Sequence, residues 1–273
     1  MYTLLRVLPK NVLSRCTGWA VNVHLPDALR LWSLRWFARH YRLNLDEAAM
    51  PLTAYRCIGE LFTRQLKPGA RYVDHAATAV HPVDGRLTQW GRIVDGTLMQ
   101  AKGLDYTLTE LVTDPQLSER LRGGGYWTYY LCPTDYHRVH SPVEGDIDHA
   151  VHVPGTLWPV NEWSVSRIDR LFTINERLVI AIQSTHGLCV VVMVGATNVG
   201  MMSVGFDPQL VSNQSGVTTQ QARHYTPSMQ IQKGDELGIF HMGSTVIVLY
   251  EHAQQLAHTE SGPHAVTWGS KLF

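Results

Sequence analysis

The chain has 273 residues, 45% of them hydrophobic, which is enough to bury a core in one large domain or in one domain with a helical appendage. Its 23 basic and 23 acidic side chains balance, so the total charge does not indicate a partner. The cysteines are scattered and form no C-x-x-C pair, which argues against a zinc site and a disulfide framework and favours a reducing cytoplasm. They are Cys16, Cys57, Cys132 and Cys189.

Positive charge is concentrated at the N-terminus. Residues 1–42 hold seven Lys or Arg against one acidic residue, Asp27, so this segment carries a net charge of +6 and the remainder −6. A basic segment that contains tryptophan suits an anionic membrane surface or a nucleic acid. The rest of the chain lacks this charge and any RNA-binding aromatic signature, so a nucleic-acid partner is not expected.

Residues 26–42 are predicted to form an amphipathic helix. Apolar side chains recur at helical spacing on one side, and three arginines fall together on another. The pattern alone favours a helix packed on the core with a solvated basic side, but the lipid chemistry inferred below favours a membrane surface. The residues predicted to contact the membrane are Trp32, Arg35, Trp36, Phe37, Arg39 and Arg42.

A second helix is predicted over residues 45–66, interrupted near Pro51. Beyond it, short segments rich in valine, aromatic residues, glycine and proline predict an antiparallel β domain, with one short helix over 108–121. The expected fold class is therefore α+β, with N-terminal amphipathic helices over 1–66 and a β-rich catalytic domain over 67–273.

Residues 178–206 have no formally charged side chain and are long enough to cross a bilayer. However, the polar sequence at 183–187 divides them. Two buried strands joined by a turn, over 178–182 and 188–194, are therefore predicted instead of a membrane-spanning helix.

The tetrapeptide Met242-Gly243-Ser244-Thr245 precedes the apolar run 246–249. Gly243 can adopt backbone angles closed to other residues, which leaves its carbonyl open to attack by the Ser244 hydroxyl. Attack would turn the amide into an ester. β-Elimination would then release the upstream chain, and hydrolysis of the dehydroalanine with loss of ammonia would leave a pyruvoyl group. Taken alone, Gly-Ser-Thr is more often an ordinary turn.

Eight further motifs occur along the chain in a fixed order. With the Gly-Ser-Thr sequence, they resemble the phosphatidylserine decarboxylases of the bacterial and mitochondrial type, from the N-terminal helices to about Tyr250. That family usually has leucine where this chain has Met242, a residue of similar volume, so cleavage is expected to survive. The motifs are Pro82-Val83-Asp84-Gly85-Arg86, Gln100-Ala101-Lys102-Gly103 with Tyr106, Asp135-Tyr136-His137-Arg138-Val139-His140-Ser141-Pro142, Pro154-Gly155-Thr156-Leu157, Val160-Asn161, Asn175-Glu176-Arg177, Val194-Gly195-Ala196-Thr197-Asn198-Val199-Gly200 and Lys233-Gly234-Asp235-Glu236-Leu237-Gly238.

The resemblance implies a self-processing enzyme whose triad is Asp84, His140 and Ser244. His140 would act as the base, and Asp84 would hold its imidazole in the needed tautomer. The cut between Gly243 and Ser244 would give chains of residues 1–243 and 244–273, which stay together as a heterodimer, with further oligomerisation left open. The covalent cofactor is a pyruvoyl group derived from Ser244, and His137 would sit by its carbonyl.

The implied substrate is phosphatidylserine in an anionic membrane, which places the enzyme peripherally on the cytoplasmic face. Its amine would form a Schiff base with the pyruvoyl group, an electron sink that lets the carboxylate leave as carbon dioxide and yields phosphatidylethanolamine. Because desolvation assists that loss, an apolar pocket is expected near His137, with Tyr136 or Trp158 in its wall.

Other interpretations are weighed against this one. Aspartate before glycine, as at Asp84, is most often only a turn former. No metal site is expected at His137 and His140, because no H-E-x-x-H sequence or nearby acidic or cysteine ligand accompanies them. A Ser-His-Asp hydrolase would usually carry a G-x-S-x-G elbow, which is missing. A lipid-binding relative that never cuts itself is the non-enzyme alternative.

Overall fold

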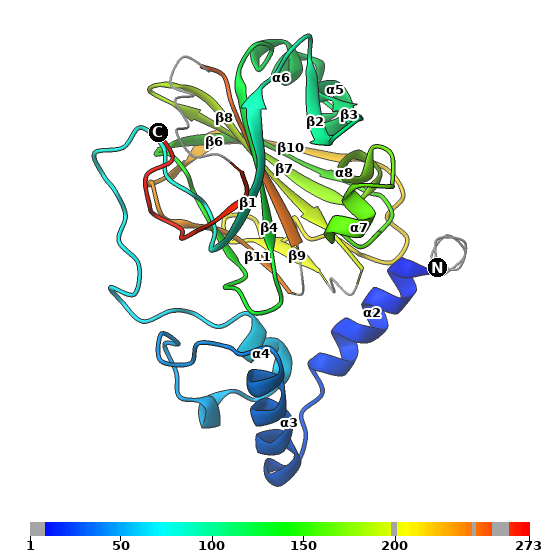
Figure 1. Ribbon diagram of the computed structural model, residues 1–273, viewed down its shortest axis with the longest axis vertical. Coiled ribbons are helices and arrows are strands. Elements are labelled where there is room, and N and C mark those ends of the chain that lie inside the picture. The colour runs from blue at the N-terminus through cyan, green and yellow to red at the C-terminus, as the bar shows by residue number, and fades with distance from the viewer. Residues whose placement is uncertain (1–8, 198–200, 242–243, 253–261) are drawn as a thin grey trace.

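The structure is a computed structural model that describes residues 9–197, 201–241, 244–252 and 262–273. N-terminal helices lie at one end of a large antiparallel sheet (Figure 1), as expected for the α+β class. The helices of the N-terminal region are α2 (Lys10–Val21), α3 (Asp27–His40), the 3-10 helix η1 (Leu52–Ala54) and α4 (Ile58–Phe62).

The predicted helix over 26–42 is confirmed by α3, and α2 is a helix that the pattern did not single out. The long helix predicted over 45–66 was wrong, because only η1 and the five-residue α4 form there. Pro51 cannot donate a backbone hydrogen bond and disfavours a helical residue before it. Cys57, with φ −155°, is extended. The backbone between the two short helices therefore cannot continue a helical ladder.

Eight strands form the main sheet, in the order β10-β6-β7-β8-β12-β4-β1-β13, and every neighbouring pair is antiparallel. A smaller sheet has the order β5-β11-β9, and β2 and β3 form a hairpin. The strands are β1 (Gly85–Arg92), β2 (Thr97–Ala101), β3 (Leu104–Thr107), β4 (Gly125–Leu131), β5 (Arg138–His140), β6 (Gly145–Val153), β7 (Arg177–Ser184), β8 (Gly187–Gly195), β9 (Met202–Val204), β10 (Gln221–Ile231), β11 (Glu236–Phe240), β12 (Ser244–Tyr250) and β13 (His264–Val266).

The two strands predicted in the uncharged stretch are confirmed by β7 and β8, which form a hairpin in the middle of the sheet. Their apolar side chains, with those of β12 and β4, form the main hydrophobic core. None of the described helices is both long and apolar enough to cross a membrane.

The helix predicted over 108–121 is in fact two helices, α5 (Leu108–Val112) and α6 (Pro115–Arg120). Thr113 takes a left-handed conformation with φ 56°, and the carboxylate of Asp114 then caps the second helix by accepting from two backbone N–H groups. Proline at the first position of a helix favours a new start there. Two further short helices, α7 (Glu162–Val165) and α8 (Leu171–Ile174), lie between β6 and β7 along the chain.

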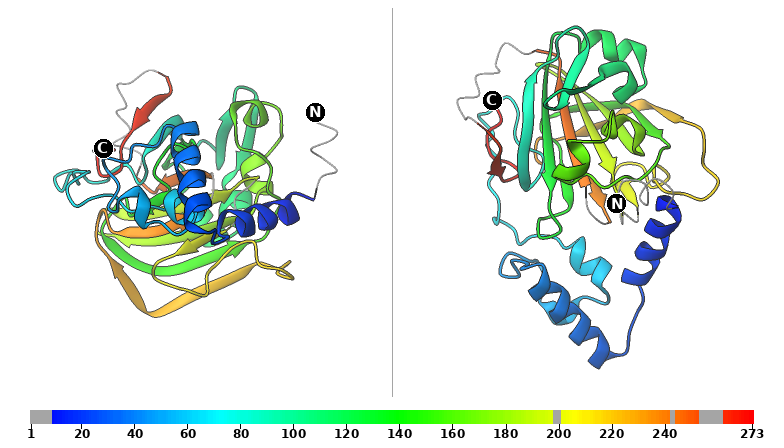
Figure 2. Two further views of the ribbon diagram at one scale, coloured as in Figure 1. Left: turned by 90° about the horizontal axis from the view of Figure 1, so that it is seen from below. Right: turned by 45° about the vertical axis from the view of Figure 1, so that its right-hand side comes forward.

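The N-terminal helices have a small core of their own, in which α3 packs against η1 and α4. They lie below the sheet in Figure 1 and in the right-hand view of Figure 2. The chain end after β13 lies beside the sheet in Figure 1. The seven residues of this small core are Leu34, Phe37, Ala38, Leu43, Tyr55, Leu61 and Phe62.

Candidate active site

Three distant parts of the chain meet at one end of the main sheet. Ser244, the first residue of β12, pairs through its backbone with Leu131, the last residue of β4. Arg86 of β1 pairs with Tyr130 on the other side of β4. The starts of β1 and β12 thus flank the end of β4, about 10 Å apart at the usual strand spacing. Asp84 directly precedes β1, so it lies at the same end of the sheet as the start of β12.

His140, the last residue of β5, joins the same edge. Its backbone N–H donates to the carbonyl of Pro82, two residues before Asp84, at 2.8 Å. The peptide bond between Gly243 and Ser244 and the hydroxyl of Ser244 lie outside the described residues. The structure therefore places Asp84 and His140 at the end of the sheet where β12 begins with Ser244. Their contact with the Ser244 hydroxyl stays a prediction.

The imidazole of His140 is buried and has a partner at each nitrogen. Nδ1 lies 2.7 Å from the carbonyl oxygen of Gly234, and Nε2 lies 3.1 Å from the hydroxyl of Tyr136. A carbonyl can only accept, so Nδ1 carries the proton and Nε2 keeps its lone pair. Burial lowers the pKa of His140 below its ordinary value. His140 is therefore a neutral imidazole whose basic nitrogen is Nε2.

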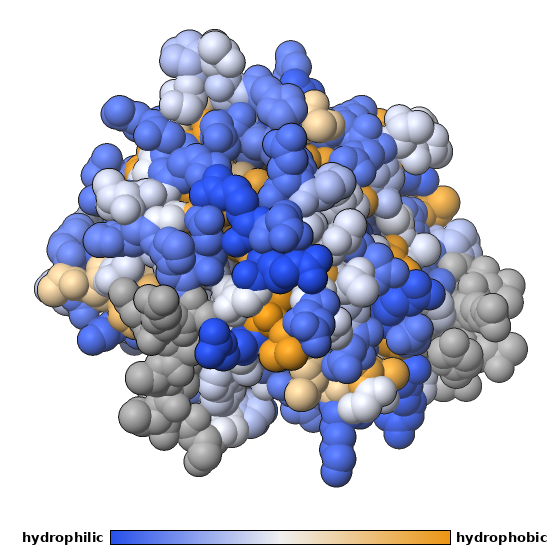
Figure 3. All heavy atoms as spheres, turned by 90° about the horizontal axis from the view of Figure 1, so that it is seen from above, coloured by the Kyte–Doolittle hydropathy of each residue, from blue (hydrophilic) through white to orange (hydrophobic). Residues whose placement is uncertain are grey.

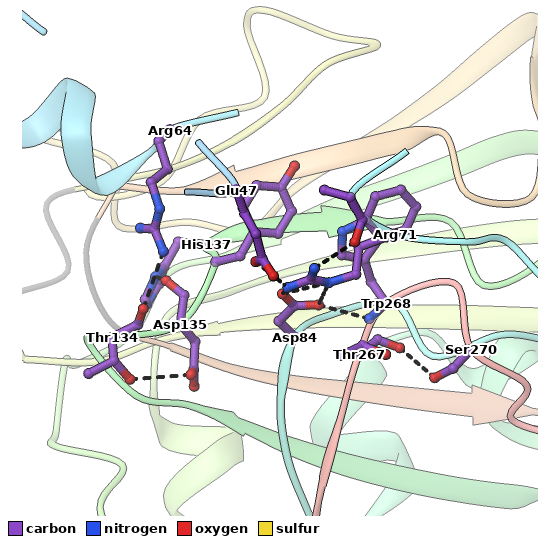
Figure 4. Close-up of polar contacts among 12 residues, drawn as sticks. Glu47, Arg64, Arg71, Asp84, Thr134, Asp135, His137, Thr267, Trp268 and Ser270 are labelled. Atoms are coloured by element: carbon purple, nitrogen blue, oxygen red, sulfur yellow. Dashed lines mark hydrogen bonds and ion pairs between the residues drawn. The ribbon is translucent and has the colours of Figure 1, made fainter. Parts of the chain in front are cut away.

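Asp84 has different partners from those we expected. The guanidinium of Arg71 donates to both its carboxylate oxygens at 2.6 to 3.1 Å, and the backbone N–H of Trp268 donates at 3.0 Å (Figure 4). The expectation that Asp84 holds the tautomer of His140 was thus wrong, since the carbonyl of Gly234 does so. The physical reason is competition, because charge-assisted bonds to Arg71 engage the carboxylate.

His137 lies just before β5 and is completely buried. Its Nδ1 donates to the carbonyl of Asp135 at 2.9 Å, and its ring packs on Phe62 of α4 at 4.0 Å between centroids. Burial, as the largest cause, lowers the pKa of His137 to about 3. Its Nε2 is a buried acceptor with no partner among the described residues. Its carbonyl accepts from the N–H of Phe240, four residues before Ser244.

A buried arginine accompanies His137. Arg64 is only 4% exposed and donates one hydrogen bond, to the carbonyl of Thr134 at 3.3 Å, close to His137 in Figure 4. Its positive charge adds to burial in lowering the pKa of His137. His137 therefore stays neutral at physiological pH and acts as a hydrogen-bond acceptor through Nε2.

Asn175 fixes the strand on the other side of Ser244. Its amide is fully buried and donates to the carbonyls of Trp158 and Gly195, both at 2.9 Å, while its oxygen accepts from the N–H of Trp158. Gly195 is the backbone partner of Ser244 in the ladder of β8 and β12. Asn175 belongs to one of the family motifs, but the sequence predicts no role for it, because its hydrogen-bond partners are distant in the chain.

A cavity of about 590 Å³ reaches Thr245, the residue after Ser244. Tyr136 and Trp158 do not line this cavity: Tyr136 bonds His140, and Trp158 lies beneath the ammonium of Lys10 at 4.0 Å. The apolar pocket expected near His137 stays a prediction. No group of three or more potential metal ligands occurs in the described part of the chain. The cavity is lined by Arg86, Thr88, Gln89, Gln100, Ala101, Thr128, Tyr130, Cys132, Val160, Asn161, Glu162, Trp163, Val165, Ser166, Phe172, Thr245 and Pro263.

Most of the chain matches a known protein family. Residues 58–273 match the phosphatidylserine decarboxylase family. The chain belongs to this family. It is 45% identical to the phosphatidylserine decarboxylase proenzyme of Anaeromyxobacter sp. (strain K) over 90% of this chain and 88% of that protein. It is 40% identical to that of Myxococcus xanthus (strain DK1622), over 98% and 91%. The chain is therefore an enzyme of a decarboxylase family.

The predicted membrane residues of this decarboxylase divide into two groups. Trp32 and Trp36 are 66% and 51% exposed on α3, and the three arginines are also exposed. Phe37 is only 5% exposed and packs against Tyr41 and Phe62, so its assignment to the membrane was wrong. It lies on the side of α3 that faces α4, where burial stabilises the small core. The exposed arginines are Arg35, Arg39 and Arg42.

Proposed function

We propose that this decarboxylase converts phosphatidylserine to phosphatidylethanolamine and carbon dioxide, after cutting itself between Gly243 and Ser244. The observation that carries the proposal is the neutral, buried imidazole of His140 at the sheet edge where β12 begins with Ser244. The proenzyme names of relatives that align over most of this chain support the same conclusion.

In the proposed cleavage, the Tyr136 hydroxyl gives up its bond to Nε2 of His140, and Nε2 takes the proton of the Ser244 hydroxyl. The hydroxyl oxygen bonds to the carbonyl carbon of Gly243, the C–N bond breaks, and protonated His140 returns its proton to the freed nitrogen, which becomes an amine. A base then removes the α-proton of Ser244, the bond from Cβ to oxygen breaks, and Gly243 leaves as a carboxylate. The remaining dehydroalanine tautomerises to an imine, water adds to the imine carbon, and the nitrogen leaves as ammonia, which gives the pyruvoyl ketone. A neutral buried imidazole suits the first step because it needs no prior deprotonation.

The residues present fit a pyruvoyl group at position 244. Nε2 of His137 is a buried acceptor without a described partner, and the carbonyl of the same residue is bonded four residues upstream of Ser244. When formed, the pyruvoyl group would supply the electrophile and electron sink for decarboxylation. In this proposal, His137 accepts a hydrogen bond from the substrate and so orients it. The cavity at Thr245 binds the headgroup of the substrate.

We further propose that residues 1–66 associate with the membrane and that residues 67–273 form the catalytic domain. The exposed tryptophans and arginines of α3 support an anionic surface at the cytoplasmic face as the place of action. The opposite face of the molecule, shown in Figure 3, is mostly hydrophilic. In the mature form, chains of residues 1–243 and 244–273 form a heterodimer.

The test is the intact mass of the purified protein. We expect the 30.7 kDa chain to give two products, residues 1–243 and a 30-residue fragment that begins with a pyruvoyl group. Ser244→Ala is expected to stay uncut, whereas Ser228→Ala, at an exposed serine of β10, is expected to be cut like the parent. A single uncut species in a preparation that decarboxylates phosphatidylserine would contradict self-processing.

A further inference from the structure

The C-terminal segment returns to the proposed site after pairing with β1. Trp268 places its indole ring on the imidazole of His140, with 3.8 Å between ring centroids and 4° between planes. The backbone N–H of the same residue donates to Asp84 at 3.0 Å. One residue near the end of the chain thus contacts both Asp84 and His140, the orienting carboxylate and the base of the predicted triad.

The backbone on both sides of Trp268 holds it in place. The carbonyl and the N–H of Gly269 bond Asp74 and His81, at 2.8 and 2.9 Å, and the N–H of Leu272 bonds the carbonyl of Ala79 at 2.9 Å. Gly269 has φ 84°, and a Cβ there would meet the carbonyl oxygen of Tyr72 at 2.5 Å. The tight turn after Trp268 therefore requires glycine.

We propose that Trp268 is the positioning residue through which Asp84 acts on His140. This inference rests on the proposed role of His140 as the base for self-cleavage. Arg71 fixes Asp84, and Asp84 fixes the backbone of Trp268 (Figure 4). The indole ring of Trp268 in turn fixes the plane of the His140 imidazole. Asp84 reaches the base by this route because its own oxygens are engaged by Arg71 and Trp268.

The stacked geometry restricts the movement of the base. The ring of Tyr136 lies at 21° to the imidazole, with 5.6 Å between centroids, and its hydroxyl meets Nε2 at the edge of the imidazole ring. Rotation of the imidazole about its bond to Cβ would drive one edge into the indole, which is already at van der Waals distance. The direction of the Nε2 lone pair is thereby set before the reaction. Such preorganisation lowers the barrier to proton transfer.

Trp268 also belongs to the smaller of the two chains that the proposed cut would produce. Residues 244–273 would supply both the pyruvoyl group at their first residue and the indole that orients the base. Several contacts attach this end of the small chain independently of the cut, among them those of β13, Gly269 and Leu272. Both ends of the small chain would therefore contribute to the site, the first residue as the pyruvoyl group and Trp268 as the ring that orients His140.

The proposal has a signature in the pH dependence of cleavage. The charged and titratable groups that face His140 are Asp84, Glu236, Arg138 and Tyr136. They stay in place when the indole is removed, but water then reaches the imidazole. Less burial raises the pKa of His140 toward its ordinary value of 6.5. Since cleavage needs the neutral base, the acid limb of its rate profile should move to higher pH.

The experiment follows the cleavage rate of freshly folded precursor by gel, from about pH 5 to about pH 8, the range in which histidine titrates. We expect Trp268→Ala and Trp268→Leu to be cut about 10- to 100-fold more slowly, a typical effect of a misplaced catalytic group, with the acid limb moved up. Trp268→Phe keeps a flat ring and is expected to restore most of the rate. Trp90→Ala is the matched control, since that ring contacts His264 in the same segment.

The outcomes separate this inference from the proposed function. A parent protein that is never cut would contradict the proposed function itself. A parent that is cut, with Trp268→Leu cut at the same rate and with the same acid limb, would overturn the role of Trp268 alone. Equal slowing in Trp268→Phe and Trp268→Ala would also overturn it, because a flat ring would then not suffice. Leucine retains more of the apolar volume than alanine does, so this comparison decides the question if the alanine variant does not fold.

Discussion

At the scale of single residues, the site depends on two histidines that burial keeps neutral. His140 has Nδ1 bonded to a carbonyl and its lone pair on Nε2, which suits proton removal. His137 also donates from Nδ1 to a carbonyl, but its Nε2 has no described partner. The same tautomer therefore serves two roles, decided by which group each Nε2 faces. In the mechanism that we propose, Nε2 of His140 exchanges the Tyr136 hydroxyl for that of Ser244, and Nε2 of His137 accepts from the substrate.

These roles predict different effects on maturation and turnover. His140→Ala and Asp84→Asn should accumulate full-length precursor, because the first loses the base and the second weakens the ion pair that holds the base indirectly. His137→Ala should leave at least part of the protein cut but poorly active. Gels of the three variants, with a phosphatidylserine assay on the cut material, decide this. Normal cutting of His140→Ala would remove it from the role of base.

At the scale of elements, α3 has one side in a small core and another in solvent. Leu34 and Phe37 are buried against η1 and α4, while Trp32 and Trp36 are exposed. Burying a large aromatic side chain typically contributes several kcal/mol, and its truncation to alanine costs about 3–5 kcal/mol. Phe37 therefore anchors the helix, and the tryptophans and arginines remain available to a surface.

This division predicts a selective loss of membrane binding. Replacing the three exposed arginines of α3 by glutamine should weaken binding to anionic vesicles, since each is worth on the order of 1 kcal/mol near such a surface. The loss should be larger at low salt, where charges are less screened. Activity on soluble short-chain phosphatidylserine should change much less. Co-sedimentation with vesicles, paired with the soluble assay, measures both. The substitutions are Arg35→Gln, Arg39→Gln and Arg42→Gln.

A matched control removes the same charge from the catalytic domain. The triple variant Arg92→Gln, Arg122→Gln and Arg167→Gln alters three exposed arginines outside α3 and should bind vesicles as the parent does. Equal binding by the α3 variant and the parent would assign membrane contact to another part of the surface. Equal loss in both triple variants would show that total charge, rather than α3, determines binding.

At the scale of the whole molecule, the proposed cut falls at the start of an inner strand, β12, and leaves the pairing of the sheet intact. β12 lies between β8 and β4, and residues 246–250 have side chains that are at most 1% exposed. Burying five such side chains stabilises the assembly by on the order of 10 kcal/mol. After cleavage, β12 would still be paired on both sides, and β13 would still be paired with β1.

We therefore expect the two chains of the cut protein to remain together. Size exclusion in native buffer should give one species that contains both fragments, and denaturant should separate them. The uncut Ser244→Ala variant provides the reference elution volume. Release of the 30-residue fragment in native buffer would contradict the conclusion that β12 is held as firmly as its burial indicates.

The sequence alone determined the family, the fold class and several elements. Ordered motifs identify the relationship without knowledge of contacts, and the apolar runs of β7 and β8 predict buried strands because both faces of a central strand need apolar side chains. The periodicity of α3 likewise reports a local preference. Each of these signals lies within a few neighbouring residues, which is why a linear sequence contains it.

Only the tertiary structure decided the partners in the site. The carbonyl that sets the tautomer of His140 comes from a residue 94 positions away, and the N–H on Asp84 comes from Trp268, 184 positions away. The burial of Phe37 was equally beyond the pattern, because a helix does not specify which apolar residue its neighbours will cover. These contacts depend on how strands order themselves in the sheet. Chain topology sets that order, and local preference does not.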